Sequence, residues 1–129
     1  MSNKMRLLVW LIVLSTIAFA ESPVKTIIPN EIEEGNQFGR TTVVSGNYIA
    51  ISAPKNDNNG FSSGSVDIFQ LVESEWEFVQ TLVPSNPSAF DYFGHSLAMD
   101  DSVLVVGTPG DNENGHKSGC VYVFRNTID

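Results

Sequence analysis

The sequence contains few cysteines, basic residues and histidines, and each scarcity excludes a class of protein. Cys120 is the single cysteine among 129 residues, which excludes an intramolecular disulfide framework and a zinc site built from cysteines. Seven basic residues stand against fifteen acidic residues, and the net charge is −8. Such an acidic chain is not expected to bind nucleic acid through its phosphates, but it can attract cations or basic partners.

Residues that could perform catalysis are also scarce. The two histidines, His95 and His116, lack the spacing of a metal-binding pair, and no serine or cysteine stands in a recognisable nucleophile motif. We therefore predict that the chain is not an enzyme, has no catalytic residue and needs no cofactor. Cys120 is expected to be buried and unreactive, or to pair between chains.

The first twenty residues have the pattern of a targeting segment. Two basic residues precede an apolar stretch at 7–17, which is followed by a small-x-small pattern at 18–20. This pattern predicts a secretory signal peptide at 1–20, cleaved before Glu21. An uncleaved membrane anchor is the alternative, but a membrane span needs about 20 apolar residues. The predicted mature chain, 21–129, is expected to be secreted or held at the cell surface, with no membrane span.

An internal repeat organises the rest of the chain. A shift of 55 residues aligns 24–70 with 79–125 without a gap and gives 12 identities in 47 positions. A gapless match of this length indicates a duplicated structural unit. Each unit contains short strand-like segments separated by turn residues, and no helical periodicity persists. The sequence therefore predicts an all-β fold of two four-stranded antiparallel blades of the β-propeller type.

The repeat also sets the expected bounds of the blades. Blade one covers about 38–83, with strands expected at 40–45, 48–52, 65–70 and 76–83. Blade two covers about 93–125 and stops before its fourth strand, with strands expected at 95–100, 103–107 and 120–125. Residues 24–28 match 79–83 and are predicted to be an orphan fourth strand. This strand either pairs with blade two or lies unpaired beside blade one.

The repeated residues resemble the FG-GAP repeat. In each unit a Phe-Gly pair precedes the first strand, a triplet ending in proline follows, and a Gly-x-Val-x-x-Phe strand comes next. The residues that carry the resemblance are Phe38, Gly39, Pro54, Gly64, Phe69, Phe93, Gly94, Pro109, Gly119 and Phe124. FG-GAP repeats build the amino-terminal propeller of integrin α chains, so the resemblance implies a non-catalytic scaffold. We expect the phenylalanine of each Phe-Gly pair to pack between blades.

The resemblance also implies a calcium site that this sequence does not reproduce. Calcium-binding blades of the family carry an Asp-x-Asp-x-Asp-Gly-x-x-Asp loop between their first two strands, whereas this chain has tight turns at 45–47 and 100–102. Asp57, Asp111 and Glu113, in the loops between second and third strands, are the remaining candidates for a metal, and their spacing does not fit an EF-hand. We predict Asn-Gly turns there rather than a metal site.

Acidic residues are concentrated in segments that an up-and-down blade places at one end. These segments are the loops between second and third strands and the crossovers 30–37 and 85–92. Long loops on a rigid sheet commonly carry binding functions. We therefore predict a ligand face for protein or glycan partners that are basic or bridged by cations, formed by Glu31, Glu33, Glu34, Asp57, Asp91, Asp111 and Glu113.

Three functional hypotheses follow from these observations. The leading one is a secreted, non-catalytic propeller module for adhesion or ligand binding. The alternatives are a non-catalytic appendage of a secreted hydrolytic enzyme and a purely structural surface repeat. Because closed propellers have about four to eight blades, two blades need partners to close a ring. Of three explanations, we favour the one in which the chain is a fragment of a longer propeller. The second is self-association of several copies through open strand edges, and the third is a two-sheet sandwich that folds alone.

Overall fold

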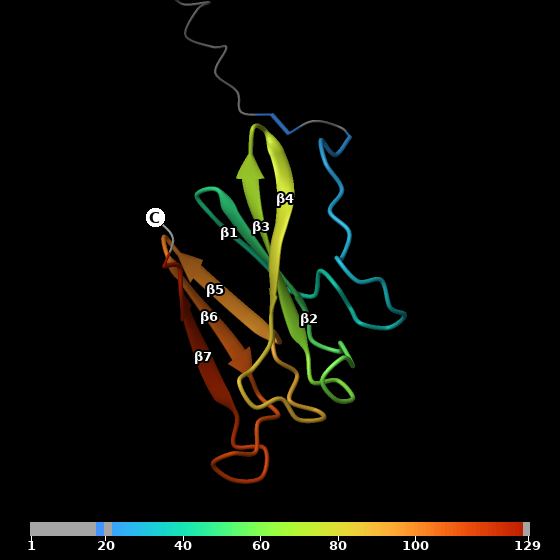
Figure 1. Ribbon diagram of the computed structural model, residues 1–129, viewed down its shortest axis with the longest axis vertical. Coiled ribbons are helices and arrows are strands. Elements are labelled where there is room, and N and C mark those ends of the chain that lie inside the picture. The colour runs from blue at the N-terminus through green and yellow to red at the C-terminus, as the bar shows by residue number, and fades with distance from the viewer. Residues whose placement is uncertain (1–17, 20–21, 128–129) are drawn as a thin grey trace, which may run out of the picture.

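The computed structural model describes residues 18–19 and 22–127, and its regular structure consists of two antiparallel sheets (Figure 1). Blade one has the order β1-β2-β3-β4, formed by Thr42–Ser45, Tyr48–Ala53, Ser65–Val72 and Glu75–Leu82. Blade two has the order β5-β6-β7, formed by Ser96–Asp100, Val103–Thr108 and Cys120–Arg125. The predicted all-β fold with two partial propeller blades is confirmed. The second blade has three strands within the described residues, not the four of a complete blade.

Tight turns set the register of each blade. Ser45 pairs with Tyr48 and Asp100 pairs with Val103, so two-residue turns connect the first two strands of both blades. Gly46 and Asp101 take positive φ angles of 54° and 48° there, which matches the mirror-image turns that suit the twist of a hairpin. The tight turns predicted at 45–47 and 100–102 are therefore confirmed.

The hydrophobic core lies between the two blades. Blade one contributes Ala50, Val66 and Ile68, which alternate with residues of its other face, and blade two contributes Leu104 and Val106. The ring of Phe93 is fully buried between them and meets two aromatic rings of β7 edge-on. The prediction that the phenylalanine of a Phe-Gly pair packs between blades is confirmed for Phe93. Phe38, its equivalent, is half-buried on the other side of blade one.

Two glycines allow the blades to approach closely. A Cβ atom at Gly94 would lie 2.8 Å from the Cβ of Ser52 on β2, and one at Gly64 would collide with the carbonyl oxygen of Phe93. Both residues also have positive φ angles, near 88°, which side chains rarely allow. The repeated glycines are therefore needed where one blade contacts the next.

The strand predicted at 24–28 does not form, because these residues belong to neither sheet. They lie beside blade one, where Lys25 Nζ is 3.0 Å from Glu75 Oε2 and the Asn30 amide donates to Asp67 Oδ2 at 3.3 Å. The neighbouring strand β3 already pairs with β2 and β4, so it offers no open edge. Most of the predicted signal peptide, 1–20, lies outside the described residues. The described residues include no helix with the length and hydropathy of a membrane span.

Candidate ligand-binding loop face

Four irregular segments meet at one end of the two blades, three of them towards the bottom of Figure 1 and the fourth along its right-hand side. They are the loops between the second and third strands, 54–64 and 109–119, and the crossovers 30–37 and 83–95. We call this end the loop face. The other end carries the two-residue turns after β1 and β5 and the turn between β3 and β4. This arrangement agrees with the expected placement of the long loops at one end.

Side-chain oxygens organise both long loops in the same way. Asp57 Oδ1 accepts from the Ser62 amide at 2.6 Å, and the equivalent Asn112 Oδ1 accepts from the Lys117 amide at 2.7 Å. One residue earlier, Asn56 and Asp111 each accept from the amide two residues further on, at 3.0 Å. These are Asx-type turns, in which the side chain replaces a backbone acceptor. The loops are therefore preformed, and the Asp57 and Asp111 carboxylates hold them in shape.

In both blades a hydrogen bond between a glutamate and an asparagine joins the crossover to the neighbouring loop. The glutamate is on the crossover in blade one and on the loop in blade two. In blade one Asn58 Nδ2 donates to Glu31 Oε2 at 2.5 Å, and in blade two Asn86 Nδ2 donates to Glu113 Oε1 at 3.0 Å. Glu31 is equivalent to Asn86 and Asn58 to Glu113 under the 55-residue shift. The reciprocal exchange was visible in the sequence and could have indicated the contact. In each blade this hydrogen bond holds the crossover against the loop at the equivalent position.

The structure separates the seven predicted ligand-face acids into two groups. Asp91 and Asp111 are 1% and 2% exposed, so they do not lie on a surface that a partner can reach. Burial of these two positions is common to both blades, since their equivalents Asn36 and Asn56 are also buried. The acids that are exposed at the loop face are Glu31, Glu33, Glu34, Asp57 and Glu113.

The buried acids have a distinct electrostatic environment. Burial is the main cause that raises the pKa of Asp91, and the nearby charges of Asp111 and Glu113 raise it further, against an opposing hydrogen bond from the Ser88 amide. That amide donates to Asp91 Oδ2 at 2.8 Å, whereas Asp91 Oδ1 is buried without a partner among the described residues. Blade one places neutral amides at these positions. The charge of Asp91 therefore destabilises blade two.

Two half-buried ionisable side chains, those of Cys120 and Tyr122, lie near Asp111. Burial raises the pKa of the Cys120 thiol, with further contributions from Asp111. Burial also raises the pKa of Tyr122 to about 12, and the Cys120 thiol adds to the shift. A thiol with a raised pKa forms less of the reactive thiolate.

An aromatic cluster on the loop face was not predicted from the sequence. Phe61 and Phe90 are both exposed, with ring centroids 5.3 Å apart, and Tyr92 lies 6.4 Å from Phe90. The Phe90 and Tyr92 backbones have φ angles of 65° and 56°, which are uncommon for residues with bulky side chains. Backbone bonds to Phe61 and Ser62 hold this conformation. Strained residues and exposed aromatic rings are typical of binding sites.

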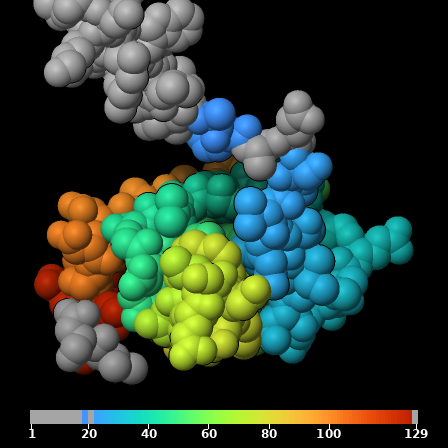
Figure 2. All heavy atoms as spheres, turned by 90° about the horizontal axis from the view of Figure 1, so that it is seen from above, coloured from blue at the N-terminus to red at the C-terminus, as the bar shows by residue number. Residues whose placement is uncertain are grey.

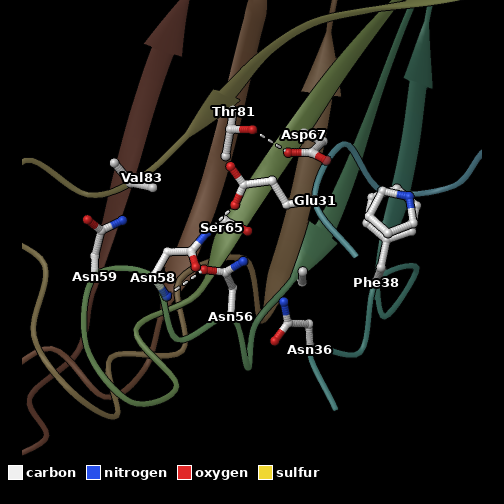
Figure 3. Close-up of a pocket in the computed structure, with 12 residues that line it drawn as sticks. Glu31, Asn36, Phe38, Asn56, Asn58, Asn59, Ser65, Asp67, Thr81 and Val83 are labelled. Carbon is white, nitrogen blue, oxygen red and sulfur yellow. Dashed lines mark hydrogen bonds between the residues drawn. The ribbon is translucent and has the colours of Figure 1, made fainter. Parts of the chain in front are cut away.

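Figure 3 shows a small polar pocket beside the loop face, on the outer side of blade one. Its volume is about 90 Å³, and its walls include Glu31, Asn56, Asp67 and Thr81. Thr81 Oγ1 donates to Asp67 Oδ1 at 2.6 Å, so that carboxylate has a partner. A cavity of this size holds a few water molecules rather than a drug-sized ligand, which needs about 300 Å³.

The residues at the turns after β1 and β5 do not fit the calcium site of the family. Gly46-Asn47 and Asp101-Ser102 are two-residue turns, and a calcium ion needs six to eight oxygen ligands from a longer loop. Within the described part of the chain, no group of three or more His, Cys, Asp or Glu side chains is arranged to hold a metal.

Two antiparallel sheets packed face to face, with the loops of both gathered at one end, define a β-propeller-type repeat module. Compared with known protein families, the chain matches the FG-GAP repeat over residues 22–69 and 76–124. It therefore belongs to the FG-GAP repeat family, whose repeats are typically extracellular, non-catalytic modules. A search of curated proteins finds no match.

Proposed function

We propose that this protein is a secreted, non-catalytic module that binds basic protein partners through its loop face. The observation that carries the proposal is the meeting of five exposed carboxylates and an exposed aromatic cluster at one end of a rigid scaffold. Both blades contribute to it. The net charge of −8 adds a long-range attraction for basic partners.

The aromatic cluster gives the proposed site a chemical preference. Phe61 and Phe90 lie between the acidic segments of the two blades, because their chain segments are joined by the Phe90 amide donating to the Phe61 carbonyl at 2.7 Å. An arginine or lysine stem can pack on such rings while its charged end meets a carboxylate. Each cation–π contact contributes about 0.5–1 kcal/mol at an exposed site. The combination favours partners with clustered arginine or lysine side chains.

The test compares two variants with the same change in charge. The loop-face variant carries neutral amides in place of its exposed acids: Glu31→Gln, Glu33→Gln, Glu34→Gln, Asp57→Asn and Glu113→Gln. The matched control neutralises exposed acids away from the loop face: Glu73→Gln, Glu75→Gln, Glu77→Gln, Asp100→Asn and Asp101→Asn. Binding to immobilised poly-L-lysine is measured for both, with calcium and with EDTA.

We expect the loop-face variant to bind at least about tenfold more weakly, which is about 1.4 kcal/mol, while the control changes little. Equal losses in both variants would show that net charge alone attracts the probe, and the proposed site would be wrong. Loss of binding in EDTA would instead indicate a cation bridge. Phe61→Ala should weaken the binding that persists at high salt, because apolar contacts are not screened.

A further inference from the structure

Equivalent faces of the two blades are covered to different extents, although their residues match in the repeat. Val66 and Ile68 of blade one are 0% and 9% exposed, because blade two covers them. Their equivalents on β7, Val121 and Val123, are 60% and 64% exposed. The uncovered face of blade two therefore has the residues of an interface between blades, without a blade on it.

The outer face of blade one is the opposite half of the same interface. A Cβ atom at Gly94 would contact the neighbouring blade, whereas one at the equivalent Gly39 would meet nothing within 4 Å. Phe93 is fully buried between the blades and Phe38 is only half-buried. The chain thus presents one half of an inter-blade interface on each side.

The segment before blade one contacts blade one in the way that the crossover after β4 contacts blade two. The Asn36 carbonyl accepts from the Lys55 amide, as the equivalent Asp91 carbonyl accepts from the Gly110 amide. Asn30 bonds Asp67 in blade one, and the equivalent Ser85 bonds Tyr122 in blade two. Figure 2 shows this segment in blue on one side of blade one and blade two in orange and red on the other. Residues 30–36 therefore take the place of a crossover, and residues 24–28, which precede them and match β4 in sequence, lie beside blade one without joining a sheet.

Blade two has an open strand edge among its described residues. Within the described residues β7 pairs only with β6, so its other edge is open. A groove of about 340 Å³ lies between the blades and reaches the end of β7 at Phe124 and Arg125. Its lining is mostly apolar, with Val79 and Leu82 of β4 and Met99 of β5 among its walls. In blade one the corresponding edge of β3 is occupied by β4. An open edge beside an apolar groove accepts an added strand.

We propose that a second copy of this chain docks head to tail on blade two and inserts its residues 24–28 as a fourth strand beside β7. The register transfers from the β3–β4 pair of blade one. Val66 pairs with Leu82 and Ile68 with Gln80, so Val121 pairs with Ile27 of the second copy and Val123 with its Lys25. The outer face of its blade one then covers Val121 and Val123. Such a heterologous contact can repeat from copy to copy.

The inserted segment is easily released from its place in the single chain. Residues 24–28 belong to no sheet, and both Val24 and Ile28 are exposed. The ion pair between Lys25 and Glu75 is exposed, and such pairs stabilise a fold little. Insertion would exchange these weak contacts for backbone hydrogen bonds and apolar burial.

The test uses purified protein from a secreting host and one variant for each half of the contact. Thr26→Pro removes a backbone donor from the inserting segment, which is outside both sheets, so the blades should still fold. Val121→Lys with Val123→Lys places charges on the uncovered face, where both valines are exposed. Val72→Lys, at the end of β3 away from this contact, is the matched control. Far-UV circular dichroism confirms that each variant is folded.

We expect light scattering to show a concentration-dependent assembly for the wild-type chain and for Val72→Lys, and monomers for each of the two contact variants. An equimolar mixture of the two contact variants should form a dimer of twice the monomer mass and nothing larger, because each retains the half that the other lacks. A wild-type chain that stays monomeric at about 100 μM would overturn the proposal, and would favour a further blade of a longer polypeptide as the occupant of this face.

A crosslink checks the register in a Cys120→Ser background. Ile27→Cys with Val121→Cys should form disulfide-linked dimers and longer chains, since directly paired residues lie within the distance of a disulfide. Ile27→Cys with Arg125→Cys is the control, because four residues along β7 separate the sites by about 13 Å. Equal crosslinking of both pairs would contradict the proposed strand insertion.

Discussion

Replacement of Phe93 by alanine should remove the side chain that fills the centre of the contact between the blades. The ring is fully buried, and its centroid lies 5.5 Å from that of Tyr122 and 6.1 Å from that of Phe124. Truncating a buried phenylalanine costs about 3–5 kcal/mol. Since small domains have a total stability of about 5–15 kcal/mol, the variant should lose a large part of its free energy of unfolding.

Phe38→Ala is the matched control, because Phe38 holds the same position in the repeat. Its side chain is half-buried and borders the shallow pocket on the outer face of blade one. Because it removes only part of its apolar area from water, we expect a loss of about 1 kcal/mol. The difference between the two losses of unfolding free energy measures how much stability the phenylalanine of a Phe-Gly pair gains when a neighbouring blade packs on it.

Equilibrium unfolding in urea, followed by circular dichroism at high dilution, checks this prediction. With a urea dependence of about 2 kcal/mol per molar, Phe93→Ala should lower the midpoint by about 2 M and Phe38→Ala by about 0.5 M. Dilution keeps the chain monomeric, so that no second copy covers Phe38. Equal shifts for the two variants would refute the reasoning, since they would mean that the blades do not pack on Phe93 as described.

Three further predictions concern the loops and turns. The raised pKa of Asp91 means that the fold favours its neutral, protonated form over its charged form. The stability that protonated Asp91 contributes is fully present below pH 3.8 and is lost as the pH rises through the raised pKa. Asp91→Asn should therefore raise the melting temperature at pH 7 and leave it unchanged below pH 3.8. Asn58→Glu should bring two carboxylates together and lower the unfolding free energy by about 0.5 kcal/mol, and adding Glu31→Asn should restore it in urea unfolding. Calcium at about 10 mM should leave the melting temperature unchanged, because an ion at one hundred times its dissociation constant would add about 2.7 kcal/mol and a clear rise.

The strands were predictable because the signals that define them are local. Val103 to Thr108 is apolar at nearly every position, and two-residue turns with Gly46 and Asp101 fix the hairpins. The 55-residue repeat predicts each strand a second time, from the equivalent residues of the other unit. Residues 24–28 have the same pattern as β4, yet they form no strand, because a strand also needs an open edge that sequence pattern does not reveal.

The candidate site was less predictable, because the exposure of an acidic side chain depends on which other chain segment packs over it in the fold. Asp91 and Asp111 lie in loop segments rich in polar residues, and nothing in the sequence distinguishes them from the exposed Asp57 or Glu113. Their burial arises where the crossover meets the loop of blade two, as the Gly110 amide donating to the Asp91 carbonyl shows. The repeat does not distinguish them either, because the equivalent positions of all four acids carry asparagine.

The loop face and the contact between copies are related by the geometry of the repeat. Blade two follows blade one with its acidic loop at the same end, as the equivalent contacts of Glu31 and Glu113 show. A second copy added by the same packing would present its own loop face at that end. Sites held together in this way act at a high effective concentration, so weak individual contacts can sum to tight binding of a multivalent partner. Thr26→Pro should then weaken binding to a dense poly-lysine surface without changing binding to a short basic peptide, which separates the effect of assembly from that of the site.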